Sequence, residues 1–228
     1  MDAWPKGVKA WYVDAPKFEP VKGDGFIGAV ESGAPVNFRN IFFNPHGHGT
    51  HTECLGHITE KIHSVNEMKL PLFLQALLVT VVPKVIGSDA VITPSILKEA
   101  LKNYSDKYEA LVIRTLPNDG KKEKNYSNSN PPFLEIECCA LMDKLGIKHL
   151  LIDTPSVDKE QDEGVLAFHH AFWKVPDQPC FDKTITELIF VPDTILDGNY
   201  LLNLQLAPFE NDAAPSRPML YPIQFKMK

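Results

Sequence analysis

Two short apolar runs separated by an amphipathic segment of helical length constrain the fold of this chain more than any other feature. Residues 110–115 and 149–153 are short runs that are mainly apolar, which predicts two buried strands. Between them, apolar residues recur at helical spacing at Leu134, Cys138, Leu141, Met142 and Leu145, and Gly146 follows where a helix C-cap is expected. This order of strand, helix and strand is typical of a parallel β-α-β unit.

The remaining segments fit the same α/β class. The continuous apolar run 77–82 predicts another buried strand, which Pro83 ends. Thr93-Pro94 is a favourable helix start and predicts a helix over about 95–104. A further helix is expected over 166–173, and strands are expected over 26–30, 36–43, 186–190, 200–206 and 221–225. The simplest account is one α/β domain over residues 1–228, with 1–24 as an extension suited to an interface.

Composition narrows the classes of function. Hydrophobic residues make up 44% of the 228 residues and charged residues 23%, which is ordinary for a globular protein with a normal core. The net charge of -6 is mild and spread along the sequence. A nucleic-acid surface would need clustered Lys and Arg, so the charge pattern argues against one. No stretch approaches the roughly 18 apolar residues that a membrane helix needs. The N-terminus lacks an apolar signal core and Cys138-Cys139 are adjacent, so we expect reduced thiols and a cytoplasmic location.

The histidines are concentrated in one segment. His46, His48, His51, His57 and His63 fall within 18 positions, with Glu53 and Glu60 among them. Imidazole and carboxylate groups are common ligands of zinc and manganese. His51 and Glu53 are two residues apart, so in extended backbone their side chains point to the same side. Gly47 and Gly49 permit the tight backbone that brings neighbouring side chains together. The segment therefore predicts a divalent-metal site.

A histidine-rich segment can also be a polar surface loop. His63 and Glu60 are expected to be exposed, and His149 is expected to be a core or strand-edge histidine. Cys54 would point away from His51 and Glu53 in extended backbone, which favours a packing role. The same role is expected for Cys138 and Cys139 on the predicted helix.

The histidine segment resembles the signature of the cyclase family, the metal-dependent hydrolases that include bacterial kynurenine formamidase. The family pattern is His-x-Gly-Thr-His-x-Asp-x-Pro-x-His, which Gly49, Thr50, His51 and His57 match. Later segments resemble the family as well: residues 112–115, residues 151–158, His169-His170 and Glu187. The likeness spans roughly residues 36–206. It implies the family's fold, an α/β domain with a mixed sheet flanked by helices.

The chain departs from the family pattern at several positions. The family's first histidine falls on Gly47, which His46 and His48 flank, and either of these two can replace it. The family's aspartate is Glu53 and its proline is Leu55, and the stretch between His169 and Glu187 is longer than usual.

The resemblance also implies roles for individual residues. Its ligands fall on His51, Glu53, His169 and Glu187, with His48 added to the expected set as a replacement for the missing histidine. His57 would transfer protons. At the distal ligand His170 is the alternative to His169, which is favoured because the family's following apolar pair then falls on Phe172 and Trp173.

The leading hypothesis is hydrolysis of a small amide, formamide or cyclic amide that depends on one or two divalent ions, with zinc favoured over manganese. Such an ion lowers the pKa of water towards about 7, and an imidazole suits proton transfer to the leaving nitrogen. The alternatives are a metal-dependent cyclase or dehydratase of a carbonyl compound, and a ligand-binding protein with weak turnover. The expected partners are a small-molecule substrate and further copies of the chain, in a homodimer or homotetramer, without nucleic acid or membrane.

Overall fold

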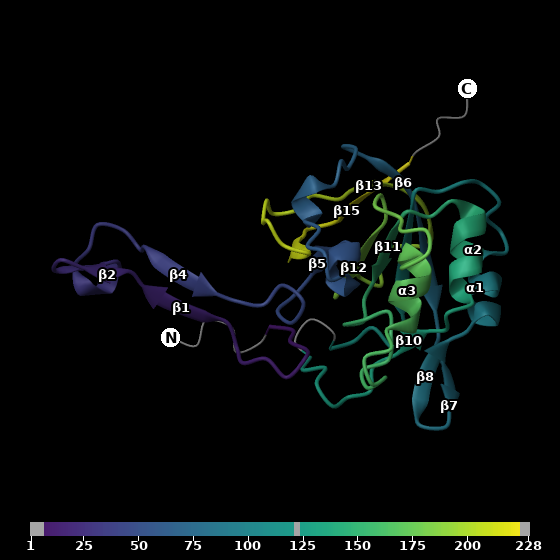
Figure 1. Ribbon diagram of the computed structural model, residues 1–228, viewed down its shortest axis with the longest axis horizontal. Coiled ribbons are helices and arrows are strands. Elements are labelled where there is room, and N and C mark those ends of the chain that lie inside the picture. Colours follow the sequence, from purple (N-terminus) through teal and green to yellow (C-terminus); the bar gives the residue numbers. More distant parts are fainter. Residues whose placement is uncertain (1–6, 121–123, 224–228) are drawn as a thin grey trace.

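The computed structural model describes residues 7–120 and 124–223, and a curled eight-stranded mixed sheet forms its centre (Figure 1). In spatial order the strands are β14 (Ala213–Pro215), β5 (His51–Glu53), β12 (Thr184–Glu187), β11 (His149–Ile152), β9 (Ala110–Thr115), β6 (Leu74–Val81), β13 (Gly198–Asn203) and β15 (Met219–Pro222). The neighbours β12, β11, β9 and β6 are parallel to one another, and the strands on either side of them are antiparallel.

Three helices cover one face of this sheet: α1 (Pro94–Leu101), α2 (Cys138–Leu145) and α3 (Ala167–Trp173). Thr93 caps α1 by accepting the Ile96 N–H, and Gly146 ends α2 with φ 84°. The helices pack on the odd-numbered side chains of β6, such as Leu77 and Val79, in the main hydrophobic core. Ala76 and Leu78 face the other side, where β13 and the segments around it close a second core.

Shorter elements complete the body. A three-stranded sheet contains β7 (Lys84–Ile86), β8 (Asp89–Ile92) and β10 (Phe133–Leu134). Two 3-10 turns, η2 (Leu55–Ile58) and η3 (Val65–Glu67), follow β5. In the described part of the chain no helix combines the length and the apolar character needed to cross a bilayer.

The predicted α/β class with a mixed sheet and flanking helices is confirmed, with all three helices on one face. The parallel β-α-β unit from β9 through α2 to β11 lies at the centre of the sheet. The prediction for residues 26–30 is wrong in part, since the strand there stops at Ile27 and the turn η1 (Val30–Ser32) follows. The predicted strand over 221–225 is β15, and its last two positions lie outside the described residues.

Residues 17–43 form an arm that projects away from the sheet and the helices (Figure 1). It consists of the antiparallel pair β1 (Lys17–Pro20) and β4 (Arg39–Phe42) and the short pair β2 (Lys22–Gly23) and β3 (Phe26–Ile27). The interface extension predicted over 1–24 therefore overlaps only the beginning of this arm. Of its two tryptophans, Trp4 lies outside the described residues, and Trp11 packs beside Ala10 and Tyr126 of its own chain.

His149 on β11 is a buried histidine, as the sequence predicts. Only 4% of it is exposed, and its Nδ1 lies 2.9 Å from Thr184 Oγ1 on the neighbouring strand β12. Burial disfavours the charged imidazole and lowers the pKa of His149 from 6.5 to about 4. The ring is therefore neutral in the folded protein at neutral pH.

This burial makes the stability of the fold depend on pH. Above pH 6.5 His149 is neutral in both the folded and the unfolded chain; between 6.5 and about 4 only the unfolded chain binds the proton, so stability falls as pH falls. We expect the difference in unfolding free energy between the protein and its His149→Gln variant to change by about 3 kcal/mol between pH 7 and pH 4. Urea unfolding at a series of pH values measures it. A difference that stays constant over this range would contradict the assignment.

Candidate metal centre

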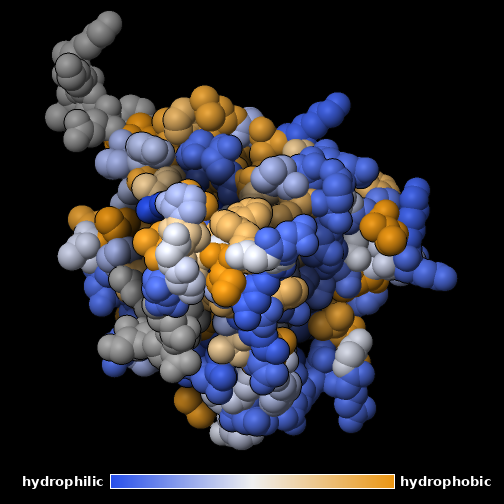
Figure 2. All heavy atoms as spheres, turned by 90° about the vertical axis from the view of Figure 1, so that its left-hand side faces the viewer, coloured by the Kyte–Doolittle hydropathy of each residue, from blue (hydrophilic) through white to orange (hydrophobic). Residues whose placement is uncertain are grey.

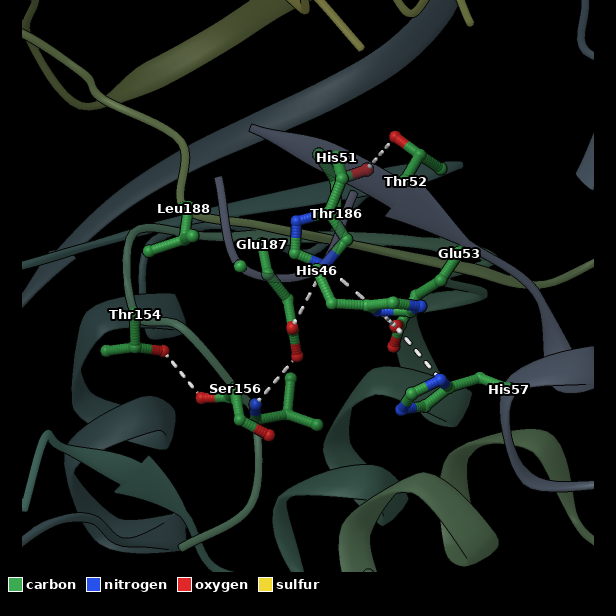
Figure 3. Close-up of polar contacts among 12 residues, drawn as sticks. His46, His51, Thr52, Glu53, His57, Thr154, Ser156, Thr186, Glu187 and Leu188 are labelled. Atoms are coloured by element: carbon green, nitrogen blue, oxygen red, sulfur yellow. Dashed lines mark hydrogen bonds and ion pairs between the residues drawn. The ribbon is translucent and has the colours of Figure 1, made fainter. Parts of the chain in front are cut away.

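Strand β5 carries His51 and Glu53, and its pairing with the neighbouring strands determines which residues lie beside them. It lies between β12 and β14, and its register places His51 opposite Glu187 on β12. Residues directly opposite each other on an antiparallel pair share one face of the sheet. The structure therefore brings His51 and Glu187 together although 136 positions separate them in the chain, and His51 Nε2 lies 3.4 Å from Glu187 Oε2. Figure 3 shows His46, His51, Glu53 and Glu187 converging on one region.

The turn before β5 carries His46 and His48, the two histidines that flank Gly47. A Cβ on Gly47 would lie 2.6 Å from Val13 Cγ2 and 3.2 Å from the carbonyl oxygen of Ala10, so this backbone position has no room for a side chain. The chain then passes through Gly49, whose φ of 139° favours glycine, and enters β5. His46, on the other side of the turn, reaches the cluster, and its Nδ1 lies 3.1 Å from Glu53 Oε2.

His48, which the sequence placed in the expected ligand set, does not reach the cluster. Its Nδ1 accepts a hydrogen bond from the Asn44 N–H at 2.7 Å, and its Nε2 lies 2.7 Å from the Asp14 carbonyl oxygen. Both ring nitrogens are thus used to hold backbone segments. His46, and not His48, therefore lies beside the other residues of the expected ligand set.

Helix α3 contributes the distal histidine. Asp158 accepts the backbone N–H groups of Phe168 and His169 and also contacts His169 Nδ1 at 2.6 Å. His169 Nε2 then points to Glu53 Oε1 at 3.0 Å. Buried aromatic residues support the ring, with the Trp173 ring centroid 5.4 Å away. The neighbouring His170 points elsewhere, with its Nδ1 3.3 Å from the Val175 carbonyl oxygen.

Two buried atoms at the centre of the cluster have no hydrogen-bond partner: His51 Nε2 and Glu53 Oε2. They face each other at 4.0 Å, on side chains that are 0% and 1% exposed. Buried polar atoms are almost always paired, so two unpartnered atoms need an explanation. A divalent cation between them would satisfy both, because neutral imidazole nitrogen and carboxylate oxygen are suitable ligands.

Glu53 belongs to two groups of side chains whose ligand atoms lie within 4.8 Å of one another. One group is His51, Glu53 and Glu187, all buried; the other is His46, Glu53 and His57, nearer the surface. Glu187 is held in place because its Oε1 accepts the Val157 N–H at 3.0 Å. Glu53 is thus the residue that the two groups have in common.

The electrostatics of the cluster also favour a cation. Burial opposes the charging of His169, yet hydrogen bonds to Asp158 and Glu53 raise its pKa to about 10. His46 is likewise buried, which opposes its charging, but the carboxylates of Asp212 and Glu53 beside its ring raise its pKa to about 10. Burial would raise the pKa of Glu53, but the neighbouring rings of His57, His169 and His46 hold it well below the ordinary value. The cluster thus attracts positive charge, and a bound cation would displace these protons.

His57 lies at the outer edge of the cluster, on η2. Its side chain is 30% exposed, and its Nδ1 is 3.9 Å from Glu53 Oε2. The sequence reasoning missed its closest partner, Asp212, whose Oδ2 lies 3.1 Å from His57 Nδ1 and 2.9 Å from His46 Nε2. These two histidines hold the pKa of Asp212 well below its ordinary value. Asp212 lies in a loop before β14, more than 150 positions after His57, and no motif connects the two in the sequence.

The cysteines take no part in this centre. The Cys54 Sγ donates to the His63 carbonyl oxygen, and Cys138 and Cys139 are buried in the main core. Burial raises the pKa of the Cys54 thiol to about 11 and those of Cys138 and Cys139 to about 12. A cavity of about 450 Å³ on the opposite face of the sheet has mostly apolar walls, and no member of the histidine–glutamate cluster lines it.

Fold and site together define an α/β protein with a buried histidine–glutamate cluster suited to a divalent ion. Comparison with known protein families identifies the family: residues 2–159 match the family model named Cyclase and described as "Putative cyclase". The chain belongs to the Cyclase family, as its resemblance predicted. It is also similar to the kynurenine formamidase of Bacillus mycoides (strain KBAB4), with 34% identity over 134 residues. That match covers 57% of this chain and 57% of the relative.

Solved structures share the fold. A protein described as a potential metal-dependent hydrolase with cyclase activity matches with a TM-score of 0.65 and 16% identity, over 94% of this chain and 92% of that one. An isatin hydrolase bound to the product analogue thioisatinate matches with a TM-score of 0.64 and 14% identity, over 92% of this chain and 83% of that one.

Proposed function

We propose that this protein is a metal-dependent hydrolase that cleaves the carbon–nitrogen bond of a small amide, formamide or cyclic amide. The observation that carries the proposal is the pair of unpartnered buried atoms, His51 Nε2 and Glu53 Oε2, inside a ring of imidazoles and carboxylates. The similarity to a kynurenine formamidase supports an amide substrate. Isatin, which names the enzyme of a structural neighbour, is itself a cyclic amide.

His51, Glu53 and Glu187 would hold the ion, with His46 and His169 on its other sides. His51 Nδ1 lies 3.0 Å from the Gly49 carbonyl oxygen and donates to it, which turns the Nε2 lone pair towards Glu53. The donor set of nitrogen and oxygen atoms suits zinc and manganese, with zinc expected. The chemistry supplied by such an ion is Lewis acidity, which lowers the pKa of water and polarises a carbonyl oxygen.

His57 is suited to move protons between water and the leaving nitrogen. It is the most exposed of the histidines around Glu53, and therefore the one that an entering substrate meets first. An imidazole can both accept and donate a proton, which is the property that this role needs. No serine or cysteine nucleophile is needed, and burial keeps the thiols of Cys54, Cys138 and Cys139 protonated.

The test is to strip the protein with a chelator, reload it with zinc or manganese, and measure formate release from an aryl formamide and ring opening of a lactam. We expect the reloaded protein to hydrolyse at least one of these amides and the stripped protein to hydrolyse neither. Turnover of a hydroxy-carbonyl compound without amide hydrolysis would favour the cyclase or dehydratase alternative. A stripped protein that takes up no ion would overturn the proposal and favour a ligand-binding role.

We further propose that the protein is a homo-oligomer, a dimer or a tetramer, in which a second copy of this chain covers the arm. Phe38 and Ile41 are 57% and 58% exposed, and Figure 2, viewed from the side of the arm, shows hydrophobic side chains gathered near the middle of this face. A two-stranded ribbon is marginally stable in water when nothing packs on it. Exposed apolar patches of this kind are typical of protein–protein interfaces.

Substitutions on the arm test this assembly. We expect the double variant Phe38→Asp with Ile41→Asp to have the mass of a single chain in light scattering, because charges replace the apolar contact. The matched control is Val85→Asp on β7, which is 75% exposed on the body and should leave the mass of the assembly unchanged. An unmodified protein that is already monomeric at micromolar concentration would contradict this part of the proposal.

A further inference from the structure

A single carboxylate oxygen joins two histidines of the centre. Asp212 Oδ2 lies 2.9 Å from His46 Nε2 and 3.1 Å from His57 Nδ1, and the two imidazole rings are 4.4 Å apart between centroids. Asp212 is about a quarter exposed at its side chain. The same carboxylate oxygen thus contacts both His46, whose side chain is 19% exposed, and His57, whose side chain is 30% exposed.

The backbone around Asp212 is tied to the elements that carry the centre. The Cys54 N–H donates to the Asp212 carbonyl oxygen at 3.0 Å, directly after Glu53. The Val65 N–H donates to the Asn211 carbonyl oxygen at 2.8 Å, on the far side of η2. The position of the carboxylate relative to β5 and η2 is therefore fixed by hydrogen bonds that do not involve its side chain.

An ionised carboxylate only accepts hydrogen bonds, so both imidazole nitrogens that face it carry a hydrogen. For a His46 ring with a single hydrogen, as it would be beside a bound cation, this leaves the lone pair on Nδ1, the atom that lies 3.1 Å from Glu53 Oε2. For a neutral His57 it leaves the lone pair on Nε2. The same carboxylate thus points a lone pair of His46 into the centre and leaves the outer nitrogen of His57 free for a proton.

The other two histidines of the centre have comparable supports. His51 Nδ1 donates to the Gly49 carbonyl oxygen and His169 Nδ1 contacts Asp158, so that in both rings Nε2 points inward. An acceptor on the outer nitrogen is the usual way in which proteins orient a metal-binding imidazole. In His46 and His57 this acceptor is shared.

We propose that Asp212 is a positioning residue that selects the tautomers of His46 and His57, aiming one at the metal and leaving the other ready for proton transfer. The roles of the two histidines rest on the proposed function. The tautomer of His57 does not, since it follows from the contact of its Nδ1 with Asp212.

The tautomers are measured by nitrogen-15 NMR of the histidine rings, with and without zinc, and His57→Gln assigns the signals. We expect the unmodified protein to carry the His57 proton on Nδ1, and Asp212→Ala to lose this preference. The zinc affinity of Asp212→Ala should fall by about 10- to 100-fold at unchanged stoichiometry, with a similar fall in kcat and a smaller change in KM. Asp212→Asn, which keeps one acceptor oxygen of the same shape, should recover part of both.

The matched control is Glu210→Gln in the same loop, whose carboxylate contacts Asn66 and should leave tautomers and zinc affinity unchanged. Unchanged His57 tautomers in Asp212→Ala would overturn the proposal, and so would a complete loss of zinc stoichiometry, which would make Asp212 a ligand. Failure of the proposed function is distinct from both: an unmodified protein without amide turnover whose His57 tautomer still depends on Asp212 would leave the positioning role standing.

Discussion

The His51→Ala variant is expected to lose bound metal and amide hydrolysis together. His51 is fully buried, and its Nε2 is one of the two unpartnered atoms at the centre of the cluster. Alanine removes this nitrogen and leaves Glu53 and Glu187 without the imidazole between them. We expect the metal content after purification, measured by elemental analysis, to fall to background. Turnover should fall about a thousandfold or more, because the ion contributes several kcal/mol to transition-state stabilisation.

The matched control is His48→Ala, three positions earlier in the same segment. Both ring nitrogens of His48 contact backbone atoms outside the cluster, so this variant should keep its metal. Circular dichroism on both variants separates loss of the ion from loss of the fold. If His51→Ala bound metal at full stoichiometry while His48→Ala did not, the assignment of the centre would be reversed.

The His57→Ala variant is expected to keep its metal and to lose turnover by about 10²- to 10⁴-fold, the usual contribution of a general acid or base. Its position supports this separation: His57 lies at the exposed edge of the cluster, while the residues assigned to the ion lie behind it. The measurement pairs metal analysis with steady-state kinetics over a range of pH. The control is His63→Ala, because His63 packs on the Phe181 ring away from Glu53. Loss of metal in His57→Ala would instead make His57 a ligand.

Local patterns predicted the centre of the fold well. Strand β9 has the predicted bounds, β11 begins at the predicted residue, and α2 ends at Gly146. Each of these signals is contained in a few neighbouring residues, through periodicity, β-branched content or a capping glycine. The arm is different: the pattern of residues 36–43 predicts a strand, and β4 forms there, but the pattern did not show that all four of its residues are exposed. An apolar run does not say whether its own chain or another copy will cover it.

The site was predictable where a motif carried it. The spacing of His51 and Glu53 gave their shared face, and the family resemblance indicated His169 and Glu187. The choice between His46 and His48 was not available, because it depends on contacts with residues outside the motif, of His48 with Asp14 and of His46 with Asp212. Asp212 had no signal at all. Its role follows from a loop that tertiary structure brings beside Glu53.

The position of β5 has a consequence for how the chain is made. This strand pairs on one side with Thr184–Glu187 and on the other with Ala213–Pro215, and both partners are synthesised long after it. During translation the segment with His51 and Glu53 must therefore wait, with both edges unpaired, until residues 184–187 and then 213–215 have emerged. Such distant pairings form late and slowly. The cluster around Glu53 thus forms late in folding, and a chain stopped before β12 would carry His51 and Glu53 on a strand with unpaired edges.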